Sequence, residues 1–263
     1  MDIIIFSGQS NMQGQSEALT STDQVPRAYE FKYTENCIVP LKNPVGEDIT
    51  HSHEKGFPLM EDTDFNSWLT SNLTGSSCYG NTNMVPEFCR SYIEVTSSEV
   101  LAVHIAKGSA DIAMWDKGSE LYSLTVKKAA AAIKEAEKAG GADRILLVWL
   151  QGESDAIYSH SRDYYKERLK KLQMSLFRDL GIEKFCVILV GRFTGDSRDD
   201  EIIAAQRELC RDDGNFVMLT EIAEELYRDP VYMNPFVGGH YSAAGLELLG
   251  RTAGRALAEA TLK

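Results

Sequence analysis

The segment GQSNM near the N-terminus carries a serine, Ser10, in a setting suited to a nucleophile. It follows an apolar run at residues 3–6, and Gly8 stands two residues before the serine. A glycine there lets the chain turn sharply from a strand into a helix, with the serine hydroxyl outward and its backbone N–H free. The spacing is neither a G-x-S-x-G elbow nor a phosphate-binding P-loop. Taken alone, the segment also fits a polar helix cap.

A serine nucleophile needs a base, and His240 is the best placed of the five histidines. It follows two glycines and precedes a helix expected to begin at about Ser242, so a flexible loop could aim its imidazole at Ser10. The other histidines lie in an irregular segment, in a buried strand or at the start of a surface helix: His51, His53, His104 and His160. A lone histidine before a helix is commonly a cap or a surface residue, so this assignment depends on the other segments.

Two further segments place polar groups after expected strands. Gly108 and Ser109 follow the second strand, where a free backbone N–H could stabilise a developing oxyanion, although a plain turn would look the same. Residues 151–155, with the sequence QGESD, follow the third strand. They could equally form a helix N-terminus capped by Ser154 and Asp155.

The elements that must position these groups alternate between short apolar runs and longer amphipathic stretches, which is typical of parallel βαβ units. Five buried strands are expected, at Asp2–Phe6, Val100–Ile105, Ile145–Leu150, Phe185–Val190 and Phe216–Leu219. Helices are expected at about 84–95, 120–139 (ending at Gly140), 162–180 (ending at Gly181) and from Ser242 to the C-terminus. Ligands bind at the carboxyl ends of the strands in such sheets, which is where the polar segments lie.

Composition restricts the class of protein. A chain of 263 residues that is 43% hydrophobic can bury one substantial core, so a single α/β domain is expected. The formal net charge of −12 argues against nucleic acid or an anionic membrane as the main partner. A neutral or weakly charged small molecule fits better, and the oligomeric state is left open.

Targeting signals are not evident. The longest apolar run, ILLVWL at 145–150, is too short to span a bilayer, and no signal peptide follows Met1. The five cysteines form an odd set without CxxC spacing, which indicates neither a disulfide framework nor a zinc site. We therefore expect a cytoplasmic protein with free thiols.

Residues 15–83 form an irregular stretch that is far longer than a normal connection between a strand and a helix. A short hairpin is expected within 29–41. The aromatic residues of this stretch favour an ordered cap over the substrate site, and a disordered surface insertion is the alternative.

The four polar segments, in this order, resemble the SGNH/GDSL hydrolase superfamily, and more closely its sialate O-acetylesterase-like group, which includes carbohydrate esterase family 6. The matching pieces are Gly8 to Met12, Gly108-Ser109 with Trp115 after it, Gln151 to Asp155, and His240 to Gly245. The resemblance implies a flavodoxin-like, three-layer α/β/α sandwich with five parallel strands in the order 2-1-3-4-5. It agrees with the number of strands read from periodicity.

The resemblance also implies roles for individual residues. Ser10 would be the nucleophile and His240 the general base. The oxyanion hole would use the backbone N–H groups of Ser10 and Gly108 and a side-chain amide. The superfamily takes that amide from an asparagine where this chain has Ser154, so Gln151 is the expected substitute. Substrate contacts are expected from residues beside these groups: Gln9, Asn11, Ser109 and Trp115.

The superfamily's acid is missing. Its members usually carry an aspartate three residues before the histidine, and residue 237 here is valine. Three explanations are open. Glu153 could orient the imidazole of His240 from the neighbouring strand end, a backbone carbonyl near Val237 could accept the Nδ1–H bond and leave a serine–histidine dyad, or activity could have been lost.

The resulting hypothesis is a serine esterase that removes O-acetyl groups from an acetylated sialic acid or plant-derived oligosaccharide through an acyl-enzyme, without a metal or organic cofactor. Trp115, Trp68 and Tyr79 are candidates for stacking on a sugar ring. Arg192 could pair with a substrate carboxylate or form a structural ion pair. The alternative from another class is a catalytically inactive protein of the same fold that binds an acylated sugar. A nucleotide-binding protein is disfavoured, because no phosphate-cradling glycine pattern is present.

Overall fold

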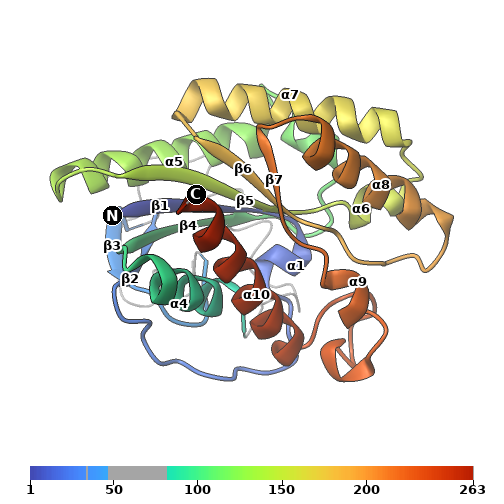
Figure 1. The fold of residues 1–263 in the computed structure, drawn as a ribbon, viewed down its shortest axis with the longest axis horizontal. Helices are drawn as coiled ribbons and strands as arrows, with labels where there is room; N and C mark the ends of the chain where they lie inside the picture. The colour runs from blue at the N-terminus through green and yellow to red at the C-terminus, as the bar shows by residue number, and fades with distance from the viewer. Residues whose placement is uncertain (34, 47–81, 263) are drawn as a thin grey trace.

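The computed structural model describes residues 1–33, 35–46 and 82–262 of the chain. Across these residues a seven-stranded sheet forms in the order β3-β2-β4-β1-β5-β6-β7 (Figure 1). The strands are β1 (Asp2–Gly8), β2 (Ala28–Lys32), β3 (Cys37–Pro40), β4 (Val100–Ala106), β5 (Arg144–Leu150), β6 (Lys184–Ile188) and β7 (Phe216–Thr220). Only β3 runs antiparallel to its neighbour, and all other adjacent pairs are parallel.

The predicted three-layer α/β/α fold is confirmed. The five predicted strands lie side by side as β4-β1-β5-β6-β7, which is the predicted order 2-1-3-4-5. β1 is central, and every residue of it is buried. Parallel strands covered on both faces read as continuous apolar runs, which is why periodicity found them.

The predicted number of five strands is too low. The hairpin expected within 29–41 does form, and its strand β2 pairs in parallel with β4 while β3 pairs with β2. The hairpin thereby extends the sheet beyond β4 and satisfies backbone groups that would otherwise stand unpaired at an edge. The pairing of β2 with β4 joins segments about 70 residues apart, so no local sequence pattern predicts it.

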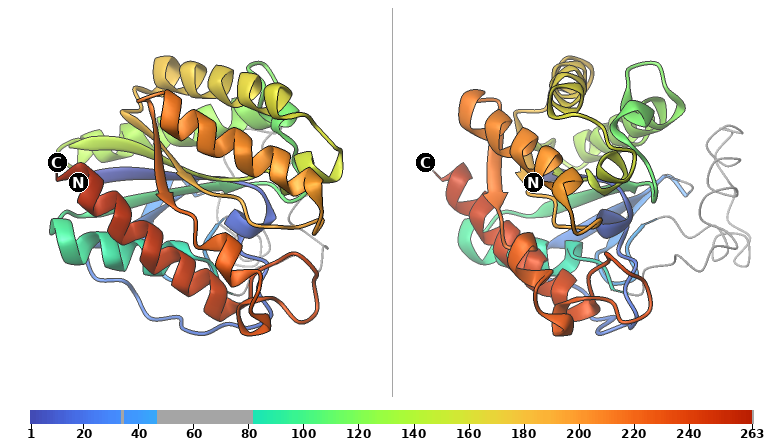
Figure 2. Two further views of the ribbon diagram at one scale, coloured as in Figure 1. Left: turned by 45° about the vertical axis from the view of Figure 1, so that its right-hand side comes forward. Right: turned by 90° about the vertical axis from the view of Figure 1, so that its right-hand side faces the viewer.

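Helices cover both faces of the sheet (Figures 1 and 2). One core layer packs under α5, α7 and α8, and the other under α4 and α10. The helices are α1 (Ser10–Gln13), α4 (Val85–Thr96), α5 (Glu120–Lys138), α6 (Glu153–Ile157), α7 (Arg162–Leu180), α8 (Ser197–Asp212), α9 (Ala223–Leu226) and α10 (Ala243–Thr261), with 3₁₀ turns η1 (Ile112–Trp115) and η2 (Pro230–Tyr232).

The predicted helix boundaries follow from their caps. The hydroxyl of Ser161 accepts the backbone N–H of Tyr164 at the start of α7, and Gly181 ends that helix with a φ of 68°. Ser242 caps α10 through the N–H of Gly245. Each cap satisfies a backbone group that the helix itself cannot. Within the described ranges, no helix is long and apolar enough to cross a bilayer.

The irregular stretch at 15–83 is described only in part. Its last described residues return to its start, because the N–H of Thr82 donates to Ser16 Oγ (2.7 Å). The predicted substrate-side cap falls largely on residues 47–81, outside the described residues, as do Trp68 and Tyr79. The cap and the domain organisation that includes it therefore stay predictions.

Candidate active site

Ser10 stands where β1 passes into the short helix α1, at the carboxyl end of the sheet (Figure 1). Gly8 makes this turn possible. Its φ is +152°, and a Cβ there would lie 1.9 Å from the carbonyl oxygen of Leu150 on β5. Only glycine allows so close an approach of two backbones. The turn leaves Ser10 as the first residue of α1, where a backbone N–H has no acceptor within the helix.

His240 lies against Ser10. Its Nε2 is 2.8 Å from Ser10 Oγ, and the two residues are only 7% and 5% exposed. The imidazole is carried by the loop before α10, and Gly239 gives that loop its shape with a φ of +72°. A Cβ at Gly239 would lie 2.2 Å from the ring of Phe193, whose ring packs edge-on against the imidazole.

The backbone orients the imidazole. His240 Nδ1 is 2.9 Å from the carbonyl oxygen of Gly238, which can only accept. Nδ1 therefore carries the proton in the neutral ring, and Nε2 is left to accept the hydroxyl of Ser10. Burial holds the pKa of His240 below its ordinary value of 6.5, against the opposing effect of the hydrogen bonds with the backbone of Gly238 and Val237. The ring is thus held in its basic, neutral form.

The expected contact between Glu153 and His240 is not formed. Val237, at the position of the superfamily's acid, is 40% exposed. Glu153 is 3% exposed, and its Oε1 accepts a hydrogen bond from Asn11 Nδ2 (2.8 Å). Burial raises the pKa of Glu153, more than the Asn11 bond lowers it. Of the open explanations, the geometry fits the backbone carbonyl, because the Gly238 oxygen takes the place that a carboxylate would occupy.

Asn11 contacts the chain on both sides of His240. Besides the bond to Glu153, its Nδ2 donates to the carbonyl oxygen of Gly239 (3.3 Å). Its Oδ1 accepts the backbone N–H of Tyr241 (3.2 Å). Asn11 is buried, so these bonds are shielded from water. Asn11 was predicted to contact substrate, and its side chain is instead committed to the protein.

Gly108 lies beside Ser10, as predicted. A Cβ on Gly108 would stand 3.7 Å from Ser10 Cβ. The N–H of Gly108 is already paired, because it donates to Oε1 of Gln13 (3.1 Å). Sequence reasoning missed Gln13, because a glutamine on a four-residue helix carries no signal that separates it from a surface residue.

The amide of Gln151 does not reach the site. The residue is fully buried, and its Nε2 donates to the carbonyl of Ala110 (3.0 Å) and to Asp155 Oδ2 (2.6 Å). Its Oε1 accepts the hydroxyl of Tyr165 (3.0 Å). All of the strong hydrogen-bonding capacity of this amide is used inside the protein, so the prediction that Gln151 serves the oxyanion hole is not supported.

Gln9, unlike Gln151, bonds to the described residues through its amide oxygen alone. Its Oε1 accepts hydrogen bonds from Gln151 Nε2 (3.3 Å), from the N–H of Gly152 (3.4 Å) and from the N–H of Ser154 (3.1 Å). These bonds fix the orientation of the amide. Its Nε2 donates to none of the described residues, so this residue next to Ser10 keeps a free donor.

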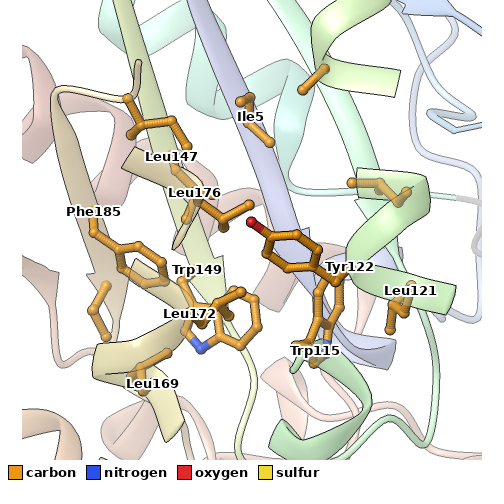
Figure 3. Close-up of a cluster of buried hydrophobic side chains, with 14 of the residues drawn as sticks. Ile5, Trp115, Leu121, Tyr122, Leu147, Trp149, Leu169, Leu172, Leu176 and Phe185 are labelled. Carbon is orange, nitrogen blue, oxygen red and sulfur yellow. The ribbon is translucent and has the colours of Figure 1, made fainter. Parts of the chain in front are cut away.

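Trp115, predicted to contact substrate, lies in the core. Trp115 is fully buried and packs edge-on against Trp149 at a centroid separation of 5.1 Å, within a cluster of core side chains (Figure 3). The prediction that Trp115 stacks on a sugar is therefore wrong, since a core ring has no free face.

Ser109, also predicted to contact substrate, is exposed on the turn after β4. Arg192 pairs with Asp200 (2.7 Å) and lies 3.6 Å from Glu224, so the structural ion pair is the reading that the geometry supports.

Comparison with known proteins shows relatives in sequence and in fold. A protein named probable carbohydrate esterase At4g34215 from Arabidopsis thaliana is 27% identical over 210 residues, which cover 78% of this chain and 74% of that protein. Its solved structure superposes with a TM-score of 0.65 at 20% identity, covering 99% of this chain and 97% of that one. NanS superposes with a TM-score of 0.62 at 14% identity, covering 100% and 98%.

A third structure, XAC1771, described as a carbohydrate acetylesterase from Xanthomonas citri, has a TM-score of 0.55 at 13% identity. It covers 96% of this chain and 56% of that one. At these identities the superpositions show the fold. The family follows from the sequence, because residues 1–257 match the family described as carbohydrate esterase, sialic acid-specific acetylesterase. The predicted resemblance is confirmed, and the chain belongs to this family of carbohydrate esterases, which are carboxylic ester hydrolases acting on acetylated carbohydrates.

Proposed function

We propose that this protein is a serine esterase that removes O-acetyl groups from a carbohydrate through an acetyl-enzyme. The observation that carries the proposal is the 2.8 Å contact between Ser10 Oγ and His240 Nε2. A hydroxyl is a weak nucleophile at neutral pH, and a neutral imidazole beside it can take its proton during attack.

The steps follow from this pair. Ser10 Oγ bonds to the acetyl carbonyl carbon while its proton passes to His240 Nε2, and the carbonyl electron pair moves onto oxygen. The tetrahedral intermediate then collapses. The bond from carbon to the sugar oxygen breaks, and the imidazolium gives its proton to that oxygen. Water then attacks the acetyl-serine carbon while its proton passes to His240 Nε2. The bond from that carbon to Ser10 Oγ breaks, the imidazolium returns a proton to Oγ, and acetic acid leaves.

The oxyanion needs donors that are in place before reaction. The N–H of Ser10 and the N–H of Gly108 supply two in this proposal. We assign the third to Nε2 of Gln9 in place of Gln151. The support is that Gln9 is anchored through its oxygen and keeps its nitrogen free, whereas Gln151 has both ends of its amide engaged.

Gln13 must move for this hole to bind substrate. Its Oε1 accepts the N–H of Gly108 in the free protein, and the substrate oxygen has to replace it. Gln13 is half-buried, so its side chain has room to turn toward solvent. A neutral hydrogen bond contributes about 1 kcal/mol net, so the displacement is a small cost relative to the oxyanion stabilisation gained.

A backbone carbonyl in place of an aspartate lowers the rate without abolishing it. The oxygen of Gly238 fixes the tautomer of His240, but it carries no full negative charge to stabilise the imidazolium. The positioned base contributes about 10²–10⁴ in rate and each oxyanion donor about 10²–10³, and both remain.

Two kinds of acetylated carbohydrate are candidate substrates, an acetylated sialic acid and an acetylated oligosaccharide. The family description names sialic acid, and the Arabidopsis and Xanthomonas proteins are named for carbohydrates. We propose that the stretch at 15–83, with Trp68 and Tyr79, selects between an acetylated sialic acid and an acetylated oligosaccharide. Comparing hydrolysis of acetylated sialic acids with that of acetyl-xylooligosaccharides tests this choice.

Hydrolysis of p-nitrophenyl acetate by the wild type, Ser10→Ala and His240→Ala tests the chemistry. We expect each variant to lose a factor of about 10⁴ or more in kcat, because the two residues act as a unit. Equal rates for the wild type and Ser10→Ala would overturn the proposal.

The second candidate, a protein that binds an acylated sugar without cleaving it, rests on the missing acid at Val237. A fluorophosphonate probe separates the two candidates. Stoichiometric labelling at Ser10 requires an activated hydroxyl, whereas an inactive binding protein stays unlabelled.

A further inference from the structure

Glu153 is a buried carboxyl group that the proposed chemistry does not use. It is the first residue of α6, soon after β5 ends at Leu150, and lies at the end of the sheet that carries Ser10. Its Oε1 accepts from Asn11, while its Oε2 is buried without a hydrogen-bond partner in the described structure. Leaving a carboxyl oxygen unpaired in the interior is costly, so a group kept there calls for an explanation.

The partner of Glu153 links the two reacting residues. Asn11 is next to Ser10 on α1, and its amide bonds to Gly239 O and to the N–H of Tyr241. These are the backbone groups on either side of His240. One side chain thus holds the nucleophile's helix to the loop that carries the imidazole.

Glu153 supports one orientation of that amide. An asparagine can rotate its side chain by half a turn and exchange its oxygen and nitrogen. The carbonyl of Gly239 can only accept and the N–H of Tyr241 can only donate, so Nδ2 is turned toward Gly239 and Glu153, where it donates to Oε1 (2.8 Å), and Oδ1 toward Tyr241. The opposite orientation would place an oxygen against Glu153 and against the carbonyl of Gly239.

From these contacts we infer that Glu153 is a positioning residue, which holds His240 in register with Ser10 through Asn11 rather than by touching the imidazole. The inference rests on the proposed serine–histidine chemistry. It also gives Glu153 a role near the loop of His240. That loop lacks the superfamily's usual acid, and Glu153 does not contact the imidazole. We call the bonds from Glu153 through Asn11 to Gly239 and Tyr241 the Asn11–Glu153 clamp.

Kinetics of two variants test the clamp. Glu153→Gln keeps an oxygen that can accept from Asn11, and we expect kcat to stay within about threefold of the wild type. Glu153→Ala removes the acceptor, and we expect kcat to fall about 10²-fold with KM changed less than about threefold, because small displacements between reacting groups cost this much. Loss in Glu153→Gln equal to that in Glu153→Ala would assign the effect to charge and overturn the clamp.

A double-mutant cycle tests whether Glu153 acts through Asn11. Asn11→Ala alone should lose at least as much kcat as Glu153→Ala. In the Asn11→Ala background, the further change of Glu153 to alanine should cost less than about twofold. Additive losses would mean that the two residues act independently, and the inference would fail.

Hydrogen exchange provides a readout that needs no substrate, so failure of the clamp can be told from failure of the esterase proposal. The N–H of Tyr241 should exchange about fivefold faster or more in Glu153→Ala and Asn11→Ala, and at the wild-type rate in Glu153→Gln. Unchanged exchange in all three would overturn the inference even if activity fell.

Asp2 provides a matched control. It is a fully buried carboxylate with one oxygen bonded to Tyr92 and Arg144 and the other unpaired, as in Glu153, but it begins β1 at the opposite end of the sheet. Asp2→Ala should lower the free energy of unfolding while leaving kcat and the exchange of Tyr241 unchanged. Equal effects of Asp2→Ala and Glu153→Ala on kcat would indicate general loosening of the fold and overturn the positioning role.

Discussion

Ser10 Oγ and His240 Nε2 lie 2.8 Å apart, although 230 positions separate the two residues. The parallel sheet produces this contact. Ser10 follows the central strand β1, and the chain from β7 through α9 and η2 returns to the same edge before α10 begins. A chemical pair built in this way depends on the whole fold, so variants must be compared at equal folded fraction.

The pH dependence of activity should report the buried imidazole. Burial lowers the pKa of His240, so the ring stays neutral and basic to lower pH than an exposed histidine. We expect kcat/KM for p-nitrophenyl acetate to be level near pH 7 and to fall on acidification through an apparent pKa below 6.5. A limb centred above pH 7 would contradict the effect of burial.

Gln9→Glu should separate the two halves of the Gln9 amide. The carboxylate keeps an oxygen for the N–H groups of Gly152 and Ser154 but replaces the free Nε2. We expect kcat to fall about 10²–10³-fold with a modest change in KM. For comparison, Gln151→Met should lower stability and leave kcat of the folded protein nearly intact. The reverse pattern would return the oxyanion role to Gln151.

Gln13→Ala removes the carbonyl oxygen that accepts the N–H of Gly108 in the free protein. Because the substrate oxygen no longer has to displace it, kcat/KM should rise by up to about fivefold, which corresponds to about 1 kcal/mol. Steady-state kinetics with p-nitrophenyl acetate measures this. A tenfold decrease would show that Gln13 assists the reaction.

Trp115→Ala should act on stability rather than on substrate binding. The ring is fully buried against Trp149, so its removal leaves a cavity and should lower the free energy of unfolding by about 3–5 kcal/mol. Urea denaturation measures the loss, and KM for an acetylated sugar is the control. A raised KM at unchanged stability would restore Trp115 as a sugar platform.

Glu153 should make stability depend on pH. Its pKa is raised from an ordinary value of 4.5, so the folded protein holds this proton more tightly than the unfolded chain. The contribution to stability is present below pH 4.5 and is lost as pH rises through the raised value. The free energy of unfolding of the wild type, relative to Glu153→Gln, should therefore decrease as the pH rises above 4.5. A constant difference would mean that Glu153 titrates normally.

Much of the fold could be predicted because its signals are local. The run at 3–6 and the run at 145–150 are apolar along their whole length, as strands buried on both faces must be. Ser161, Ser242 and Gly181 mark helix ends through bonds within one turn. The hairpin was also visible, but its attachment to β4 was not, since pairing between distant strands leaves no mark in either segment.

The candidate site, like the fold, could be predicted only in part from the sequence. Residue types and their order in the sequence, together with the resemblance of the four polar segments to a known superfamily, singled out Ser10, Gly108 and His240 as candidates. Which amide remains free to donate, Gln9 or Gln151, and which group orients His240 were decided only by the tertiary structure. The residue type determines which chemistry a side chain can perform. Whether its hydrogen bonds are already satisfied depends on neighbours that packing brings from elsewhere in the chain.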